Sequence, residues 1–211
     1  GPDFPMTDEA PVKTLDFSGT DFSYGYEMDE YYIAEFQGGN QQIYDQRGEL
    51  LFDKVQAVGE RTGEVIYGIT PEAVYIGTWN YSDSYIYNFR EGRIVTEPGD
   101  QVQGSMVSGG WGYFTVTRGD SKFVCNEQGD WAYSSNGQVY DRFIGGEYFG
   151  NWKDGVLYIE KKETEEYYEI PRPEDTGGLE IRGSLFYLNG GQGGQKPAIY
   201  SGSRCLVEGE Y

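Results

Sequence analysis

Histidine is absent from the sequence, and its absence excludes several kinds of catalytic site. Nucleophilic catalysis by a Ser-His-Asp or Cys-His arrangement needs an imidazole base, and many zinc sites use histidine as a ligand. The two cysteines, Cys125 and Cys205, are too few for a four-cysteine metal site and form no Cys-x-x-Cys pair. A phosphate-binding loop and a dinucleotide-binding fingerprint are missing as well. We therefore predict no cofactor, no bound metal and no catalytic residue.

Basic residues are scarce relative to acidic ones. The 211 residues include 16 Lys and Arg but 35 Asp and Glu, which gives a formal charge of −19. Such a chain repels nucleic acid and anionic membrane surfaces, whereas it attracts cationic ligands. No apolar run approaches the length of a membrane span, so we predict no nucleic-acid partner and no membrane insertion. The alternative is that the negative charge serves solubility alone.

The first residues of the chain differ in composition from the rest. Residues 3–15 read DFPMTDEAPVKTL and are rich in proline and acidic side chains. This composition predicts a flexible acidic N-terminal tail over residues 1–15 and a folded domain over residues 16–211. Such a tail suits a protein held away from a cell surface, so we expect an extracytoplasmic location, secreted or surface-anchored. It equally suits an ordinary ragged terminus.

Glycine and tyrosine, by contrast, are abundant, and a hairpin pattern repeats along the chain. The stretch IYDQRGELLF at 43–52 places an apolar run, a polar residue, a glycine turn and a second apolar run in order. Similar stretches lie at 86–95 and 124–133, and weaker ones at 158–170 and 199–207. Gly48, Gly92 and Gly129 can supply the positive φ that a tight turn needs. Two further apolar runs precede each hairpin, so the repeated unit has four strands.

Five repeats of a four-stranded unit of about forty residues predict an all-β protein with little or no helix. We predict a single five-bladed β-propeller of four-stranded antiparallel blades, at about 20–54, 63–98, 102–134, 137–170 and 178–210. Residues 14–19 could add a strand to the last blade and close the ring. The alternative is an open or rolled meander of β hairpins. Both cysteines lie in apolar strand contexts, so we expect two buried free thiols, with a disulfide bridge between them as the alternative.

The hairpins resemble those of bacterial WG-repeat proteins, in which an aspartate–turn–glycine hairpin recurs. The chain is also similar to small five-bladed propellers, which include lectins. The resemblance covers about residues 20–210, although the Trp-Gly pair that names the first family occurs only once, at Trp111-Gly112. It implies the architecture, and no sugar-binding motif of a lectin family carries over onto named residues.

Aromatic residues recur where the second strand of a unit ends, at Phe36, Trp79 and Trp152, with Tyr81 and Lys153 beside them. The turns after these strands open onto one face of a propeller, where a ring can stack on a sugar or cover a cation. These five residues are therefore the predicted ligand-binding site. The predicted function is a non-catalytic binding module for a protein or glycan ligand, including a cationic one. The alternative role for the rings is packing between blades.

The alternative function is a small carbohydrate-active enzyme of the glycoside hydrolase type, because that chemistry needs only paired carboxylates. The first strands of the units, which would line the centre, offer the acids Glu27, Glu64, Asp141 and Glu180. Ordinary surface acids are the simpler interpretation of these four residues. If the aromatic rings are scaffold, function should lie in the loops between units, around Arg61, Asp100 and Asp175.

Overall fold

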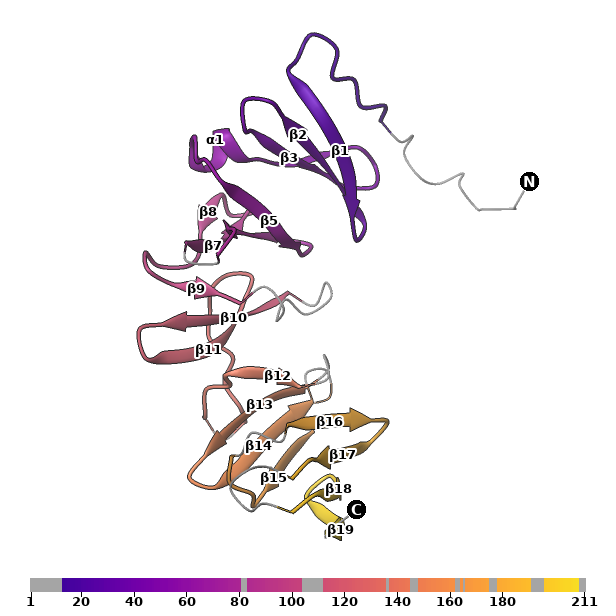
Figure 1. The fold of residues 1–211 in the computed structure, drawn as a ribbon, viewed down its shortest axis with the longest axis vertical. Helices are drawn as coiled ribbons and strands as arrows, with labels where there is room; N and C mark the ends of the chain where they lie inside the picture. Colours follow the sequence, from indigo (N-terminus) through magenta and orange to yellow (C-terminus); the bar gives the residue numbers. More distant parts are fainter. Residues whose placement is uncertain are drawn as a thin grey trace, which may run out of the picture. The chain divides into compact units, whose positions relative to one another are not determined.

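A computed structural model describes residues 13–80, 83–103, 112–135, 137–144, 148–161, 164, 166–174, 178–190 and 196–208. The chain divides into two compact units, Gly1–Glu97 and Pro98–Tyr211, and each is described by itself. Figure 1 shows that both are built from antiparallel strands, with the short helix α1 (Lys54–Val58) in the first. No helix in the described ranges is long and apolar enough to cross a membrane.

The first unit contains two four-stranded sheets, termed blades 1 and 2, in which each strand pairs with the next. Blade 1 consists of β1 (Phe22–Met28), β2 (Tyr31–Phe36), β3 (Gln41–Tyr44) and β4 (Leu50–Asp53). Blade 2 consists of β5 (Glu64–Ile69), β6 (Ala73–Thr78), β7 (Ser84–Asn88) and β8 (Arg93–Ile94). Helix α1 follows β4 directly and begins at the cap residue Asp53, whose side chain accepts a hydrogen bond from the backbone of Gln56.

The second unit contains three sheets, termed blades 3 to 5. Blade 3 consists of β9 (Gln101–Val102), β10 (Tyr113–Arg118) and β11 (Ser121–Asn126). Blade 4 consists of β12 (Arg142–Ile144), β13 (Tyr148–Lys153), β14 (Val156–Lys161) and β15 (Tyr167–Ile170). Blade 5 consists of β16 (Leu179–Arg182), β17 (Leu185–Leu188), β18 (Ala198–Ser201) and β19 (Arg204–Glu208). The predicted all-β fold of five successive antiparallel sheets, as in a β-propeller, is confirmed.

One polar residue organises the turn after the third strand of blades 1, 2 and 3. Its side-chain oxygen accepts hydrogen bonds of 2.8 to 3.0 Å from two backbone N–H groups of the turn. These residues are Asp45, Asn88 and Asn126. The chain then turns through glycines with positive φ, namely Gly48 (81°), Gly92 (69°) and Gly129 (86°). The role predicted for these glycines is confirmed, because other residues rarely adopt such a φ.

Blade 3 departs from the predicted four strands, since its described residues form three. Two isolated bridges, Cys125 with Trp131 and Tyr133 with Val139, take the place of a fourth strand. The reason is that two segments share the outer edge of β11. Ala132 donates its N–H to the carbonyl of Val124, and Val124 donates its own N–H to Tyr140. Neither segment pairs far enough along the edge to become a strand.

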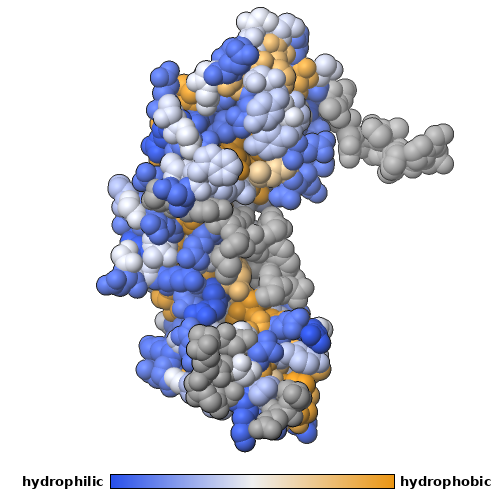
Figure 2. Space-filling view, viewed as in Figure 1, coloured by the Kyte–Doolittle hydropathy of each residue, from blue (hydrophilic) through white to orange (hydrophobic). Residues whose placement is uncertain are grey.

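Each unit has an apolar core of its own. In the first unit, Ile33 and Ile43 of blade 1 pack with Val74 and Ile76 of blade 2. In the second unit, blades 4 and 5 share a core to which each contributes; it includes Leu157, Ile159, Phe186 and Leu188. Every residue of β7 is buried, so both faces of this strand are covered, which explains the lack of polar alternation in its sequence. Figure 2 shows the visible surfaces as a mixture of hydrophilic residues and smaller hydrophobic patches.

Residues 13–21, the described part of the segment ahead of blade 1, contain no strand, so the expectation that residues 14–19 add one to the last blade is wrong. The ring of Phe17 stacks on Phe22 of β1 instead, with 4.5 Å between ring centroids. Thr20 then donates its N–H to the carbonyl of Phe17, which closes a turn. Aromatic stacking and this turn hold the segment against blade 1.

The two cysteines lie in different environments. Cys125 in β11 is 1% exposed, whereas Cys205 lies in β19, where all five residues are exposed. Both are free thiols. The prediction of a buried thiol is therefore right for Cys125 and wrong for Cys205, because β19 is the outer strand of its sheet. Burial raises the pKa of the Cys125 thiol to about 12.

We expect one thiol per chain to react quickly with a thiol reagent in the native protein at mildly alkaline pH, and two after denaturation. The thiolate is the reactive form, and Cys125 is both inaccessible and protonated under these conditions. Absorbance of the released thiol-reagent product measures the stoichiometry. A Cys205→Ser variant should lose the fast reaction entirely. A fast reaction that survives in this variant would contradict the burial of Cys125.

Candidate functional site

The predicted ligand-binding residues of the first unit lie in two different environments. Phe36 ends β2 and is half-buried, since the rings of Phe17 and Phe22 contact it at 5.7 and 5.9 Å between centroids. Trp79 follows β6 directly and is 80% exposed. Tyr81 lies outside the described residues. Of the described members of this group, Trp79 presents a ring to solvent, whereas Phe36 is packed against the segment ahead of blade 1.

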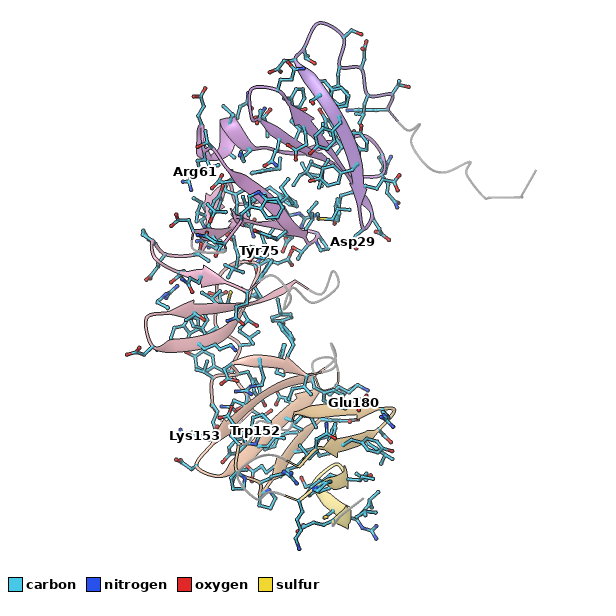
Figure 3. All side chains as sticks on the ribbon, in the orientation of Figure 1. Asp29, Arg61, Tyr75, Trp152, Lys153 and Glu180 are labelled. Atoms are coloured by element: carbon cyan, nitrogen blue, oxygen red, sulfur yellow. The ribbon has the colours of Figure 1, made fainter. Side chains whose placement is uncertain are left out.

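In the second unit, Trp152 and Lys153 are consecutive residues at the end of β13 (Figure 3). The indole of Trp152 is half-buried and donates a hydrogen bond of 3.0 Å from Nε1 to the carbonyl of Arg172. The guanidinium of Arg142 lies over the same ring, 4.9 Å from its centroid. Lys153 is exposed. The packing alternative thus describes the surroundings of Trp152 well, while Lys153 is accessible.

The first-strand acids considered for a hydrolase are mostly held in ion pairs. Asp141 lies 2.7 Å from Nε of Arg142, and Glu180 lies 3.1 Å from a guanidinium nitrogen of Arg182. Glu64 is buried with a cation of its own, as described next. Glu27 lines a hollow at one end of blade 1.

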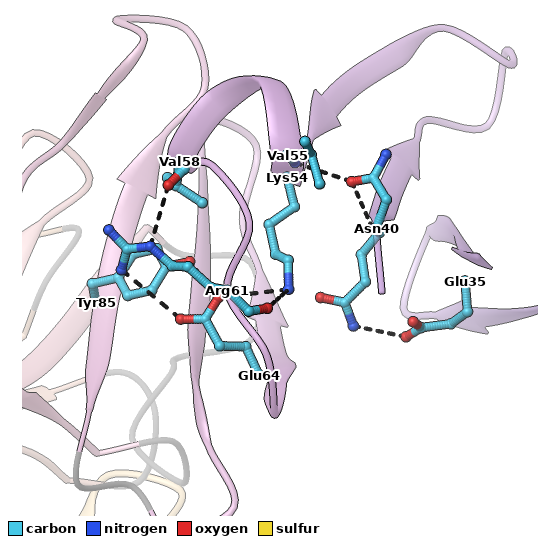
Figure 4. A network of polar contacts seen from close by, with 9 residues as sticks. Glu35, Asn40, Lys54, Val55, Val58, Arg61, Glu64 and Tyr85 are labelled. Carbon is cyan, nitrogen blue, oxygen red and sulfur yellow. Dashed lines mark hydrogen bonds and ion pairs between the residues drawn. The ribbon is translucent and has the colours of Figure 1, made fainter. Parts of the chain in front are cut away.

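A buried charge network joins blades 1 and 2 (Figure 4). Lys54 is 1% exposed; its Nζ lies 3.6 Å from Glu64 and donates to the carbonyl of Arg61 at 3.1 Å. Glu64 also accepts a 3.0 Å hydrogen bond from the hydroxyl of Tyr85. The guanidinium of Arg61 lies over the Tyr85 ring at 4.7 Å. Burial, and next the Glu64 carboxylate, raise the pKa of Tyr85, so this hydroxyl stays a hydrogen-bond donor.

Buried charged residues also connect different segments of the second unit. Asp100, which is 2% exposed, forms two 2.8 Å hydrogen bonds with the guanidinium of Arg118 in β10. Arg172, which follows blade 4, donates to the carbonyl of Asn189 beyond β17 at 3.0 Å. Asp175 lies outside the described residues. Asp100 is thus held in a buried ion pair, whereas Arg61 is exposed at the edge of the Lys54–Glu64 network.

An open hollow of about 350 Å³ lies at one end of blade 1 and is termed the acidic hollow. Two turns meet there, the β1–β2 turn and the β3–β4 turn, because antiparallel strands place alternate turns at the same end of a sheet. The carboxylates that line it are those of Glu27, Asp29, Glu30 and Asp45. Figure 3 labels Asp29 at the opposite edge of the first unit from Arg61. Glu64, three residues after Arg61, pairs with Thr78, so Trp79 lies at the Arg61 end of blade 2 and not at the acidic hollow.

Two tyrosine rings complete the wall of the acidic hollow. Tyr31 and Tyr32 begin β2, directly after the two acids of the first turn. The Tyr32 ring lies across Gly25 of β1, where any side chain would collide with its hydroxyl. Glycine at that position therefore allows the ring to lie against the sheet, beside the carboxylates. Both residues are half-buried, and Tyr31 also packs against the apolar core of the first unit.

The chemistry of the acidic hollow suits an organic cation. Carboxylates form charge-assisted hydrogen bonds with ammonium and guanidinium groups, and tyrosine faces attract the same groups. Across the described part of the chain, no group of three or more acidic, histidine or cysteine side chains is close enough to hold a metal ion. The acids surround the hollow instead of converging on one point. This spacing favours a ligand with several atoms over a single ion.

Comparisons with known proteins add likenesses of structure only. No protein-family model and no curated protein matches the chain. Hsv2 of Kluyveromyces lactis has a TM-score of 0.34 and 9% identity, over 86% of this chain and 61% of that one. The computationally designed protein Ika8 has a TM-score of 0.31 and 12% identity, over 94% of this chain and 64% of that one. A eukaryotic initiation factor has a TM-score of 0.38 and 10% identity, over 96% of this chain and 47% of that one. The chain spans less than two thirds of the length of each of these three structures.

Proposed function

We propose that this protein is a non-catalytic binding module whose acidic hollow receives a lysine or arginine side chain of a partner protein. The observation that carries the proposal is that four acidic residues and two tyrosines line one hollow of about 350 Å³. The formal charge of −19 supports it, because a negative protein raises the local concentration of cationic partners and speeds their association.

The strength of such binding can be bounded from the exposure of the carboxylates. Glu27, Asp29 and Glu30 are exposed, and an exposed ion pair contributes only about 0.2–1 kcal/mol. Several such pairs with a cation–π contact give weak binding that falls as the salt concentration rises. A partner with two or more basic side chains in one extended segment would therefore bind better than a single free amino acid.

The test is calorimetric titration of a lysine- and arginine-rich peptide into the protein at low salt. A Glu27→Gln/Glu30→Gln variant should bind about fivefold to tenfold more weakly, since two exposed ion pairs of about 0.5–0.7 kcal/mol each are lost. The matched control is Glu60→Gln/Glu91→Gln, which removes the same charge from exposed positions in the same unit. Equal weakening in both variants would show general attraction to a negative protein, and the acidic hollow would not be the site.

A second candidate site is the ring of Trp79, which the sequence assigns to recognition of a protein or glycan. Its 80% exposure favours this assignment, because a large aromatic ring is rarely left in solvent without a partner. The hydroxyl of Thr78 donates to the side chain of Asn80 at 2.8 Å, which orders the residues on either side of the ring. The module would then have two separate binding surfaces.

An extracytoplasmic location is also part of the proposal. Its support is the proline- and acid-rich composition of residues 3–15, which suits a spacer between a domain and a surface. A binding module in that position would meet the basic segments of other proteins.

A further inference from the structure

Residues 13–17, termed the strap, run beside the acidic hollow. The N–H of Lys13 donates to the carbonyl of Arg47 at 2.9 Å, and its Nζ lies 2.9 Å from Glu49. Gly48 makes this approach possible, since a Cβ there would lie 2.8 Å from the carbonyl oxygen of Lys13. The strap therefore begins against the β3–β4 turn, which also supplies part of the hollow's acidic lining.

The other end of the strap is fixed by aromatic contacts. The Phe17 ring is stacked on Phe22 with an interplanar angle of 8°, and it meets the rings of Phe36 and Tyr44 edge-on. Leu15, between the two ends, lines the acidic hollow together with Lys13. The intervening Thr14 and Asp16 are exposed, as expected for an extended segment with one side against the sheet.

We propose that the strap regulates the acidic hollow, with Lys13 acting as an internal competitor of the cationic ligand. This inference rests on the proposed function. Lys13 is the basic side chain among the described residues that line the hollow, whose other charged members are all acidic. Its ammonium group pairs with Glu49, the residue after the lining residue Gly48, and it repels any second cation that enters. An incoming lysine or arginine must therefore displace Lys13 or share the hollow with it.

The two ends of the strap differ in strength, which allows such displacement. Lys13 and Glu49 have side chains that are 61% and 53% exposed, so their ion pair is weak and easily exchanged. Phe17, in contrast, contacts three rings. A ligand can release the Lys13 end while the Phe17 end stays in place, so the blade itself need not change. A simple structural role for Lys13 predicts the opposite, namely that its loss weakens binding.

The test compares the same basic peptide with wild type and with Lys13→Gln by calorimetry at low salt. We expect Lys13→Gln to bind about threefold more tightly or better, because one like charge next to the ligand is removed. Lys13→Arg keeps the cation and should bind as wild type does. The matched control is Lys122→Gln, an exposed lysine of β11 whose loss changes the net charge equally, and it should leave the affinity unchanged.

Unchanged or weaker binding by Lys13→Gln would overturn the inference, as would equal tightening by Lys122→Gln. The Glu27→Gln/Glu30→Gln changes, added to Lys13→Gln, separate this result from a failure of the proposed function. If those acid changes weaken binding but Lys13→Gln does not strengthen it, the hollow is the site and Lys13 is no competitor. If the acid changes have no effect in either background, the peptide binds elsewhere and the proposed function fails first.

Discussion

Replacing Lys54 with methionine should lower the free energy of unfolding by about 3 kcal/mol, measured by urea denaturation. Lys54 and Glu64 are both buried, and removing one partner of a buried ion pair leaves an uncompensated charge at a cost of about 3–5 kcal/mol. The lower end of that range applies, because Tyr85 still donates to Glu64 and Arg61 lies 3.9 Å from its carboxylate. Methionine fills a similar volume, so the loss reports on charge more than on packing.

The double variant Lys54→Met/Glu64→Leu decides whether charge is the cause. Removing both partners of a buried pair is often nearly neutral, so this variant should recover most of the lost stability. A double-mutant cycle then gives the coupling between the two side chains. If the double variant is instead less stable than either single variant, the two residues act through separate packing contacts. Lys122→Met, at an exposed position, controls for the loss of a lysine as such.

The parts of the fold that could be predicted are those fixed by neighbours in sequence. The units predicted at about 20–54, 63–98 and 178–210 contain all the strands of blades 1, 2 and 5, which span 22–53, 64–94 and 179–208. Apolar runs and a polar residue followed by glycine determine each hairpin locally. The repeat therefore contained enough information to place five sheets in order.

Features that depend on distant segments could not be predicted in this way. The short helix α1 continues the strand β4 without a break, and its sequence KVQAV contains two β-branched valines that also suit a strand. The described residues of blade 3 form three strands because two segments share the hydrogen bonds of Val124. The carbonyl of Val124 accepts from Ala132, and its N–H donates to the carbonyl of Tyr140. Nothing in a local pattern of polar and apolar residues specifies such sharing.

The candidate sites also combine features that the local sequence predicts with features that depend on distant segments. The hairpin pattern at 43–52 places Asp45 at a turn, but its meeting with Asp29 at one hollow depends on the antiparallel order of blade 1. The buried role of Lys54 depends on a partner ten residues later, in the next blade. Without knowledge of that partner, a lysine at the end of a strand is expected to be exposed to solvent.

Trp79 and Trp152 occupy equivalent positions in the repeat, but the contacts of their rings differ. Two residues outside its own hairpin contact Trp152. Arg142, before the hairpin, lies over its ring, and the carbonyl of Arg172, after the hairpin, accepts its hydrogen bond. The described surroundings of Trp79 leave its ring 80% exposed. Position in the repeat therefore predicts where a tryptophan lies along a strand, and tertiary contacts decide whether its ring packs.

Trp152→Ala should lower the free energy of unfolding by about 2–4 kcal/mol, somewhat less than a fully buried tryptophan, and Trp79→Ala by less than about 0.5 kcal/mol. The first change removes a half-buried ring, its cation–π contact and the hydrogen bond to Arg172, whereas the second removes an exposed ring. Thermal melts of the two variants measure the difference.

Binding then separates the two roles that remain for Trp79. If its ring recognises a ligand, Trp79→Ala should lose the hits that wild type gives on a glycan or protein array while melting at the wild-type temperature. Trp79→Phe, which keeps an aromatic face, should retain part of that binding. An early melt of Trp79→Ala would mean that the ring packs against another part of the protein and is scaffold. Recognition would then rest on the acidic hollow, whose carboxylates are untouched by this change.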